Sequence, residues 1–228
     1  MRPIFLFGLS SILLAQAANP PWNLPGACMT PQGTVCRTVR WEYATWAAGS
    51  WFLALQRGNG SHTLAYRRDG ASLDWATSRF FRNYLTPVEN GDVSIITLPV
   101  QHQTISIFHA DKSCDVSGVL GAKPTAWNPN DPDCRQGVNH LSELKRVGEV
   151  VIAGVRSIEY AGRGSSTSRT TVALAPSLGC MEMRNVYRDY NRLGLPTAFS
   201  EAEVVSVQIG EPDPALFQVP KGYHQVNR

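Results

Sequence analysis

The chain has 228 residues, of which 43% are hydrophobic and 17% are charged. This composition excludes collagen-like, coiled-coil and wholly disordered proteins, and it is typical of a folded globular chain. Lysine and arginine number 21 and the acidic residues 18, for a formal net charge of +3, and neither sign gathers into a tail or stripe. We therefore predict no nucleic-acid partner.

Residues 1–17 are predicted to be a secretory signal peptide. Arg2 supplies a positive start, an apolar run follows over residues 4–14, and an A-x-A cleavage pattern stands at 15–17. The run is shorter than the roughly 20 apolar residues of a membrane span. We expect an exported protein, periplasmic or extracellular, that does not span the membrane after cleavage. Residues 18–228 are expected to form one monomeric domain.

Five cysteines follow the predicted cleavage site, and an oxidising compartment would favour disulfides between them. Short separations suggest two local pairs, Cys28 with Cys36 and Cys114 with Cys134, although four cysteines allow three connectivities. Cys180 is then the free thiol. We interpret it as a small buried side chain rather than a nucleophile or an intermolecular link, because no base can be placed beside it.

Turn dipeptides in the first half of the mature chain predict β-hairpins. Asn59-Gly60, Asp69-Gly70 and Asn90-Gly91 are typical turn dipeptides. Strands are predicted at 51–55, 63–67, 92–98 and 104–108. Apolar residues recur at helical spacing over 72–84. This segment and residues 135–145 are the two best candidates for helices.

A long excursion rich in Gly, Pro, Asn and Asp is predicted at 111–137, where no periodicity is sustained. Further antiparallel strands are predicted after it, at 150–160, 170–174, 181–190 and 203–209. Prolines end the last of these, and Leu216 and Phe217 are expected to form a buried hydrophobic latch after it.

The tail from Gly210 to Tyr223, G-E-P-D-P-A-L-F-Q-V-P-K-G-Y, resembles the close of LolA-like and outer-membrane lipoprotein-sorting-like proteins. Residues 147–155 also look like a strand of that group, which consists of exported bacterial proteins. The resemblance implies a mainly β fold: a curved antiparallel sheet that forms an incompletely closed barrel, with helices over its concave face. It further implies a role in moving or sensing acylated lipoproteins, and it identifies no ligand-contacting residue.

Motifs for catalysis, phosphate binding and dinucleotide binding are missing from the sequence, so we predict no catalytic residue, no cofactor and no metal. His109, Cys114, Cys134 and His140 have side chains that bind zinc but lack a recognised spacing. The acidic stretch 128–133 lacks the Gly and Glu of a calcium loop. The histidines have no serine or carboxylate at an informative spacing, and a hydrolase is the least favoured function.

Four tryptophans in the first third, Trp41, Trp46, Trp51 and Trp75, are the candidate ligand-binding residues. Their broad apolar faces suit a ligand groove or the core of a large sheet, and the core is the favoured interpretation. The leading hypothesis is a non-enzymatic cell-envelope protein that binds a lipid, another apolar ligand or an acylated partner protein in its concave face. The alternative is a protein-interaction or sensor module with no small ligand.

Overall fold

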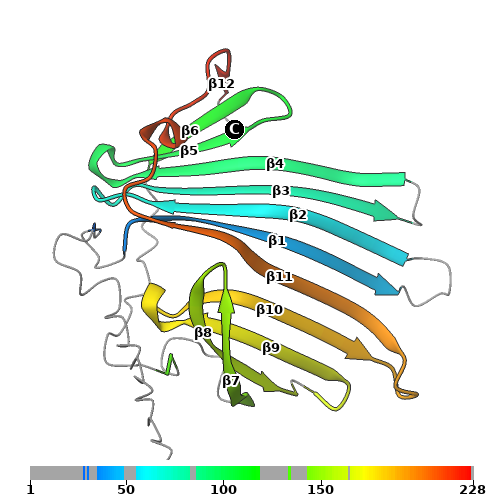
Figure 1. Cartoon of the computed structure of the whole chain (residues 1–228). Helices are drawn as coiled ribbons and strands as arrows, with labels where there is room; N and C mark the ends of the chain where they lie inside the picture. The colour runs from blue at the N-terminus through cyan, green and yellow to red at the C-terminus, as the bar shows by residue number, and fades with distance from the viewer. Residues whose placement is uncertain are drawn as a thin grey trace, which may run out of the picture.

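The computed structural model describes Cys28, Thr30 and residues 35–48, 55–82, 86–118, 133–134, 143–163 and 165–226 (Figure 1). The predicted signal peptide, Trp51, His140 and most of the stretches 128–133 and 135–145 lie outside these residues.

A single sheet of twelve strands makes up most of the described chain. The strands are β1 (Arg37–Ala48), β2 (Leu55–Tyr66), β3 (Ser72–Arg82), β4 (Thr86–Leu98), β5 (Gln103–Phe108), β6 (Ser113–Gly118), β7 (Lys145–Ile152), β8 (Val155–Gly162), β9 (Ser168–Ala175), β10 (Met181–Tyr190), β11 (Pro196–Ile209) and β12 (His224–Gln225). Their order across the sheet is β12-β6-β5-β4-β3-β2-β1-β11-β10-β9-β8-β7. All neighbours are antiparallel except β12 and β6.

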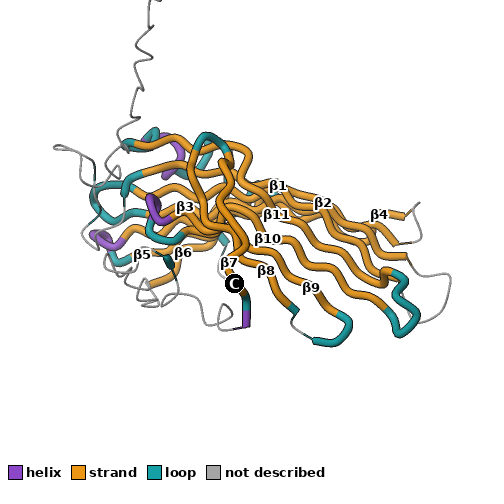
Figure 2. The backbone as a smooth tube through the Cα atoms, turned by 60° about the horizontal axis from the view of Figure 1, so that its bottom comes forward, coloured by secondary structure: helices purple, strands orange, loops and turns teal. Residues whose placement is uncertain are grey.

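The sheet is twisted and curled, and it does not close into a barrel, as the resemblance of the tail implied (Figures 1 and 2). Strands β12 and β7 form its two edges. At one edge the β7–β8 hairpin folds back, so that Ile152 belongs to the same hydrophobic cluster as Val204 of β11. Three short 3-10 turns have described bounds, η2 (Pro99–Gln101), η4 (Pro176–Leu178) and η5 (Pro214–Phe217), and Glu143 is also in 3-10 conformation. No helix in the described part of the chain is long and apolar enough to cross a membrane.

The helix predicted at 72–84 is wrong, because residues 72–82 form β3. This strand pairs along its length with β2 and β4, and the ladder hydrogen bonds on both sides outweigh an apolar spacing that suits either structure. The helices expected over the concave face are likewise not found in the described residues; the C-terminal segment and the β7–β8 hairpin cover parts of the sheet instead.

Turn dipeptides predicted only some of the hairpins. Asp69-Gly70 connects β2 to β3, as expected, but Asn59-Gly60 and Asn90-Gly91 lie inside β2 and β4. Ala153 and Gly154 form the two-residue turn between β7 and β8, with φ of 47° and 79°. These left-handed angles match the twist of the flanking strands. Residues 150–160 are therefore a hairpin and not one strand, and β6 occupies the start of the predicted excursion.

The hydrophobic clusters lie at one end of the long strands. The first cluster is on β3–β6 and is covered by the segment after β11, which we call the C-terminal segment (residues 211–226). Phe217 is its anchor at 5% exposure, and Leu216 packs beside it, so the predicted latch is present. The other two clusters lie around β9–β11 and around the β8–β9 pair.

One disulfide joins Cys28 to Cys36, which is the expected pair. The second joins Cys134 to Cys180, and Cys114 is the buried free cysteine, so the predicted pairing of Cys114 with Cys134 and the predicted free thiol of Cys180 are wrong. Six strands separate β6, which carries Cys114, from β10, which follows Cys180. Neighbouring strands are about 4.8 Å apart and a disulfide requires Cα atoms within about 7 Å, so proximity in sequence does not bring Cys114 to Cys134.

Candidate functional site

An open polar groove of about 910 Å³ crosses the middle of the sheet, and we call it the trough. Its wall on β1 is made by Arg40, Glu42 and Ala44, which alternate along the strand and are all exposed. Register places Ser61 and Asn59 of β2 beside them on one side, and Glu203 and Glu201 of β11 on the other. Thr77, Arg79 and Asp92 continue the trough onto β3 and β4.

Negative charge is concentrated where β1 meets β11. Glu42 lies directly opposite Glu203, an arrangement of like charges that destabilises a sheet unless a cation compensates it. Arg184 of β10 does so for Glu203, with an Nη1–Oε2 distance of 3.5 Å, and it also pairs with Glu159. Glu42 has a longer contact with Arg40, 3.7 Å between exposed side chains. Glu201 forms no ion pair with any described residue, so the trough has an uncompensated acidic group in its lining.

Tyr43 crosses the sheet above Gly60, and only glycine fits beneath it. The Tyr43 hydroxyl donates a hydrogen bond of 3.0 Å to the carbonyl oxygen of Thr77. A Cβ atom at position 60 would lie 2.0 Å from that oxygen and 2.4 Å from the Tyr43 hydroxyl. This close approach explains why a glycine occupies the interior of β2, where its backbone freedom is otherwise a cost.

Tyr43→Phe is expected to lower the free energy of unfolding by about 1 kcal/mol at pH 8, the usual value for one hydrogen bond. Burial raises the pKa of the Tyr43 phenol above its ordinary value, and a hydrogen bond with Ser78 opposes this effect. A raised folded pKa favours the protonated phenol, so its contribution is complete below the unfolded pKa of about 10 and is lost as pH rises through the folded pKa. Urea unfolding from pH 8 to 11.5 should therefore show the wild-type advantage shrinking. An advantage that stays constant over this range would contradict the assignment.

The trough ends in an apolar pocket of about 500 Å³. Trp46 of β1 and Phe199 of β11 lie opposite each other there, and the Arg188 guanidinium lies over the Phe199 ring at 5.8 Å. Ala44 and Asn59 line both spaces, so the polar trough and the apolar pocket are continuous.

The structure does not bring together the three candidate tryptophans that it describes, Trp41, Trp46 and Trp75. Trp41 alternates with the trough residues and faces the other side, where it stacks on His62 with ring centroids 5.4 Å apart and donates to the Glu182 carbonyl. Trp75 stacks on His109 and donates a 2.8 Å hydrogen bond to Asp92. Trp41 and Trp75 both pack against hydrophobic clusters, whereas Trp46 lines an open pocket.

A serine–histidine pair that the sequence did not reveal lies under the C-terminal segment. The Ser94 hydroxyl is 2.6 Å from His109 Nε2, and His109 Nδ1 is 2.9 Å from the Tyr223 hydroxyl. Pairing of β4 with β5 creates this arrangement, so no local spacing could have signalled it. Ser94 is 3% exposed, and the second ring nitrogen meets a phenol instead of a carboxylate. The trio fastens the tail to the sheet and presents no accessible nucleophile.

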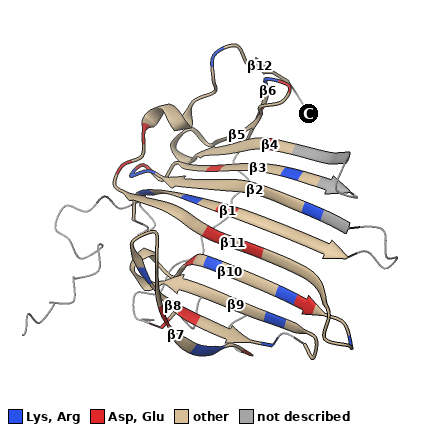
Figure 3. Ribbon diagram, turned by 45° about the vertical axis from the view of Figure 1, so that its right-hand side comes forward, with Lys and Arg blue, Asp and Glu red and all other residues tan. Residues whose placement is uncertain are grey.

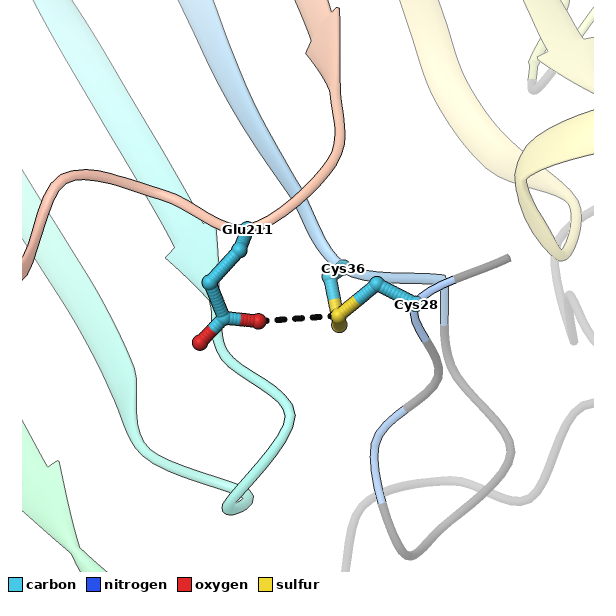
Figure 4. A group of neighbouring side chains, drawn as sticks. All are labelled: Cys28, Cys36 and Glu211. Carbon is cyan, nitrogen blue, oxygen red and sulfur yellow. Dashed lines mark hydrogen bonds between the residues drawn. A yellow bond between two sulfur atoms is a disulfide. The ribbon is translucent and has the colours of Figure 1, made fainter. Parts of the chain in front are cut away.

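The disulfide of Cys28 lies against Glu211 at the start of the C-terminal segment (Figure 4). Glu211 Oε2 is 2.8 Å from Cys28 Sγ, but a disulfide sulfur carries no proton, so this is a contact and not a hydrogen bond. Glu211 accepts the Arg68 backbone N–H at 3.2 Å and pairs with Arg67 at 3.5 Å. Cys28, Cys36 and Glu211 have metal-binding side chains, yet the disulfide withholds the thiolates that a metal requires.

Comparisons with solved structures found similar chains. Pseudomonas aeruginosa MucB in its complex with MucA is 15% identical with a TM-score of 0.38, and the match covers 81% of this chain and 56% of that one. LprF from Mycobacterium bovis is 10% identical with a TM-score of 0.37, over 80% and 90% of the two chains. A proposed outer membrane lipoprotein-sorting protein domain from Vibrio parahaemolyticus is 7% identical with a TM-score of 0.23, over 80% and 89%.

No protein-family model matches this sequence, and no curated protein matches it. The present chain spans a little over half of the MucB chain. Identities of this size concern the fold alone, and no residue's role is carried from these proteins to this chain.

Proposed function

We propose that this protein is a non-enzymatic binding protein of the cell envelope, and that its trough holds a polypeptide partner. The Trp46–Phe199 pocket would take an apolar group of that partner, either an acyl chain or a large apolar side chain. One observation carries the proposal: an exposed polar trough and an apolar pocket form one continuous surface.

The polar lining supports a polypeptide over a free lipid. Glu42, Glu201 and Glu203 offer acceptors for basic side chains, and Ser61 and Asn59 offer hydrogen bonds to a peptide backbone. A free acyl chain would instead require a mainly apolar cavity, because burying carboxylates against hydrocarbon is costly. Only the apolar pocket could hold such a chain, because the trough is polar. This favours an acyl chain that is attached to a polypeptide over an unattached lipid.

Two further features support an envelope location and a binding role. Two disulfides suit an oxidising compartment, as does the predicted signal peptide. The Ser94–His109 pair is buried under the C-terminal segment, where it makes a structural contact, and neither residue lines the trough.

Photo-crosslinking tests the proposal directly. A photoreactive residue replaces Ala44 in the trough or, as the control, Ala76, which is exposed on the opposite face. We expect a polypeptide adduct in the cell envelope from position 44 only. Trp46→Ala should lower the adduct yield about tenfold, since burial of a large apolar group contributes about 1.5 to 3 kcal/mol. Tyr187→Ala, an exposed aromatic on the other face, should not change it.

Native mass spectrometry of gently purified protein separates the outcomes. A bound polypeptide that is lost with Trp46→Ala supports the proposal. A bound lipid without polypeptide, or equal crosslinking from positions 44 and 76, would contradict it.

A further inference from the structure

Several basic residues lie at the end of the sheet that is remote from the hydrophobic clusters, and Figure 3 shows others elsewhere on the sheet. The connections β8–β9 and β10–β11 lie side by side there and enclose an open pocket of about 460 Å³. Arg163 and Arg169 line it from one side, and Arg192 from the other. We call these residues the arginine tip.

Most of this charge is not neutralised. Residues 163–169 and 187–195 contain four arginines and one acidic residue, Asp189, and their excess of three equals the formal charge of the whole chain. No acidic residue in the described part of the chain forms an ion pair with Arg163, Arg169 or Arg192. Asp189 accepts the backbone N–H of Tyr190 at 3.0 Å, and Arg169 lies over the Tyr190 ring at 5.6 Å.

Local hydrogen bonds hold both connections in place. Ser165 Oγ accepts the backbone N–H groups of Thr167 and Ser168 at 3.2 and 3.0 Å, and the Thr167 carbonyl accepts the Tyr190 N–H at 3.1 Å. Asn191 Oδ1 accepts two backbone N–H groups, from Leu193 at 2.9 Å and Leu195 at 3.0 Å. Arg192 therefore projects from an ordered turn and Arg169 from the start of β9, which lowers the entropy cost of binding.

Two leucines project beside the arginine tip. Leu193 is 84% exposed and Leu195 58% exposed, on the turn that carries Arg192. The hydrogen bonds of Asn191 fix the backbone on which they stand, and Gly194 supplies the left-handed residue at φ 77°. The exposed leucines lie next to cations that no acidic residue neutralises. Together they are complementary to a surface that is anionic outside and apolar beneath: the cations fit the anionic layer and the leucines the apolar one.

We infer that the arginine tip docks on a membrane surface that contains anionic phospholipid. The guanidinium groups would bind phosphate oxygens of the headgroups, for which their paired donors are well shaped, and the two leucines would enter the acyl boundary. The inference is independent of the trough, because neither the arginine tip nor the two leucines line the trough or the apolar pocket. A soluble polyanion would use the arginines but would gain nothing from the leucines.

Vesicle flotation of the protein purified from the periplasm tests the inference. The vesicles contain phosphatidylcholine alone or phosphatidylcholine with phosphatidylglycerol. We expect binding only to the anionic vesicles, weakened by salt. Arg169→Gln with Arg192→Gln should weaken it about 25-fold, at roughly fivefold for each arginine near such a surface. Arg68→Gln with Lys221→Gln removes the same charge elsewhere and should leave binding unchanged.

The leucines separate a membrane from other anions. Leu193→Ser with Leu195→Ser should weaken vesicle binding at least about fivefold, while binding to a heparin column, measured on the same variants, stays unchanged. Retained thermal unfolding transitions would show that each variant is folded. Any of three results would overturn the inference. They are wild-type protein that does not float with anionic vesicles, an arginine variant that binds like wild type, and leucine variants with unchanged vesicle binding.

Discussion

Replacing Cys134 and Cys180 together by serine is expected to lower the free energy of unfolding by about 4 kcal/mol. The disulfide closes a loop with a sequence separation of 46, and the loss of that constraint releases chain entropy in the unfolded state, an effect worth about 4 kcal/mol for a loop of this length. Cys134 is fully buried, beside Ile158, Tyr160 and Leu174, so serine also places a hydroxyl among apolar side chains. Urea unfolding under non-reducing conditions measures the change.

The Cys28–Cys36 disulfide provides the control. Its sequence separation is only 8, so its double serine variant should lose about 2.5 kcal/mol by the same relation. A smaller loss for the Cys134–Cys180 variant than for the Cys28–Cys36 variant would mean that the longer crosslink is not a main constraint on this fold.

Phe217→Ala is expected to cost about 3 to 5 kcal/mol, the range for removing a buried phenylalanine side chain. Phe217 is 5% exposed, belongs to the cluster on β3–β6, and carries the Arg67 guanidinium over its ring at 5.2 Å. Its loss leaves a cavity between η5 and the sheet and removes the anchor of the C-terminal segment. Thermal and urea unfolding measure the loss, and hydrogen exchange should show faster exchange at β12.

Gln218→Ala is the matched control, because Gln218 is exposed on the adjacent position. It should change stability by less than about 0.5 kcal/mol. Equal effects of the two substitutions, or a Phe217→Ala variant with wild-type stability, would show that the segment is not held by burial of this ring.

Sequence patterns predicted the class of fold well and its connections less well. The alternation over 104–108 is confirmed, because Ile105 and Ile107 face the core at 9% and 2% exposure. The alternation over 203–209 is not kept, because the register between β1 and β11 shifts at Arg40 and Trp41, so that Val204 is buried while Val205 is 47% exposed. Asn59-Gly60 favours a turn by its local conformation, but β2 pairs with β1 and β3 through that point, and Gly60 is needed for the passage of Tyr43. Dipeptide chemistry cannot reveal such a contact across three strands.

The candidate site was the least predictable part of the molecule. Trp46 could be nominated by its residue type, but its partner Phe199 is 153 positions away and is brought to it by the β1–β11 pairing. Glu42 and Glu203 meet through the same pairing, as do the two connections of the arginine tip through β9 and β10. Both proposed sites depend on strand order, which residue spacing does not encode.

The rate at which the Cys114 thiol is alkylated would report how often the C-terminal segment opens. Cys114 is 5% exposed and belongs to the cluster that contains Phe217, while Val226 donates to its backbone carbonyl at 2.8 Å. An alkylating reagent can reach the sulfur only when the segment lifts, so the labelling rate is the intrinsic thiol rate multiplied by the open fraction when closing is fast. The other described cysteines are held in disulfides and do not compete. The alkylation rate thus measures local opening of the C-terminal segment separately from unfolding of the sheet.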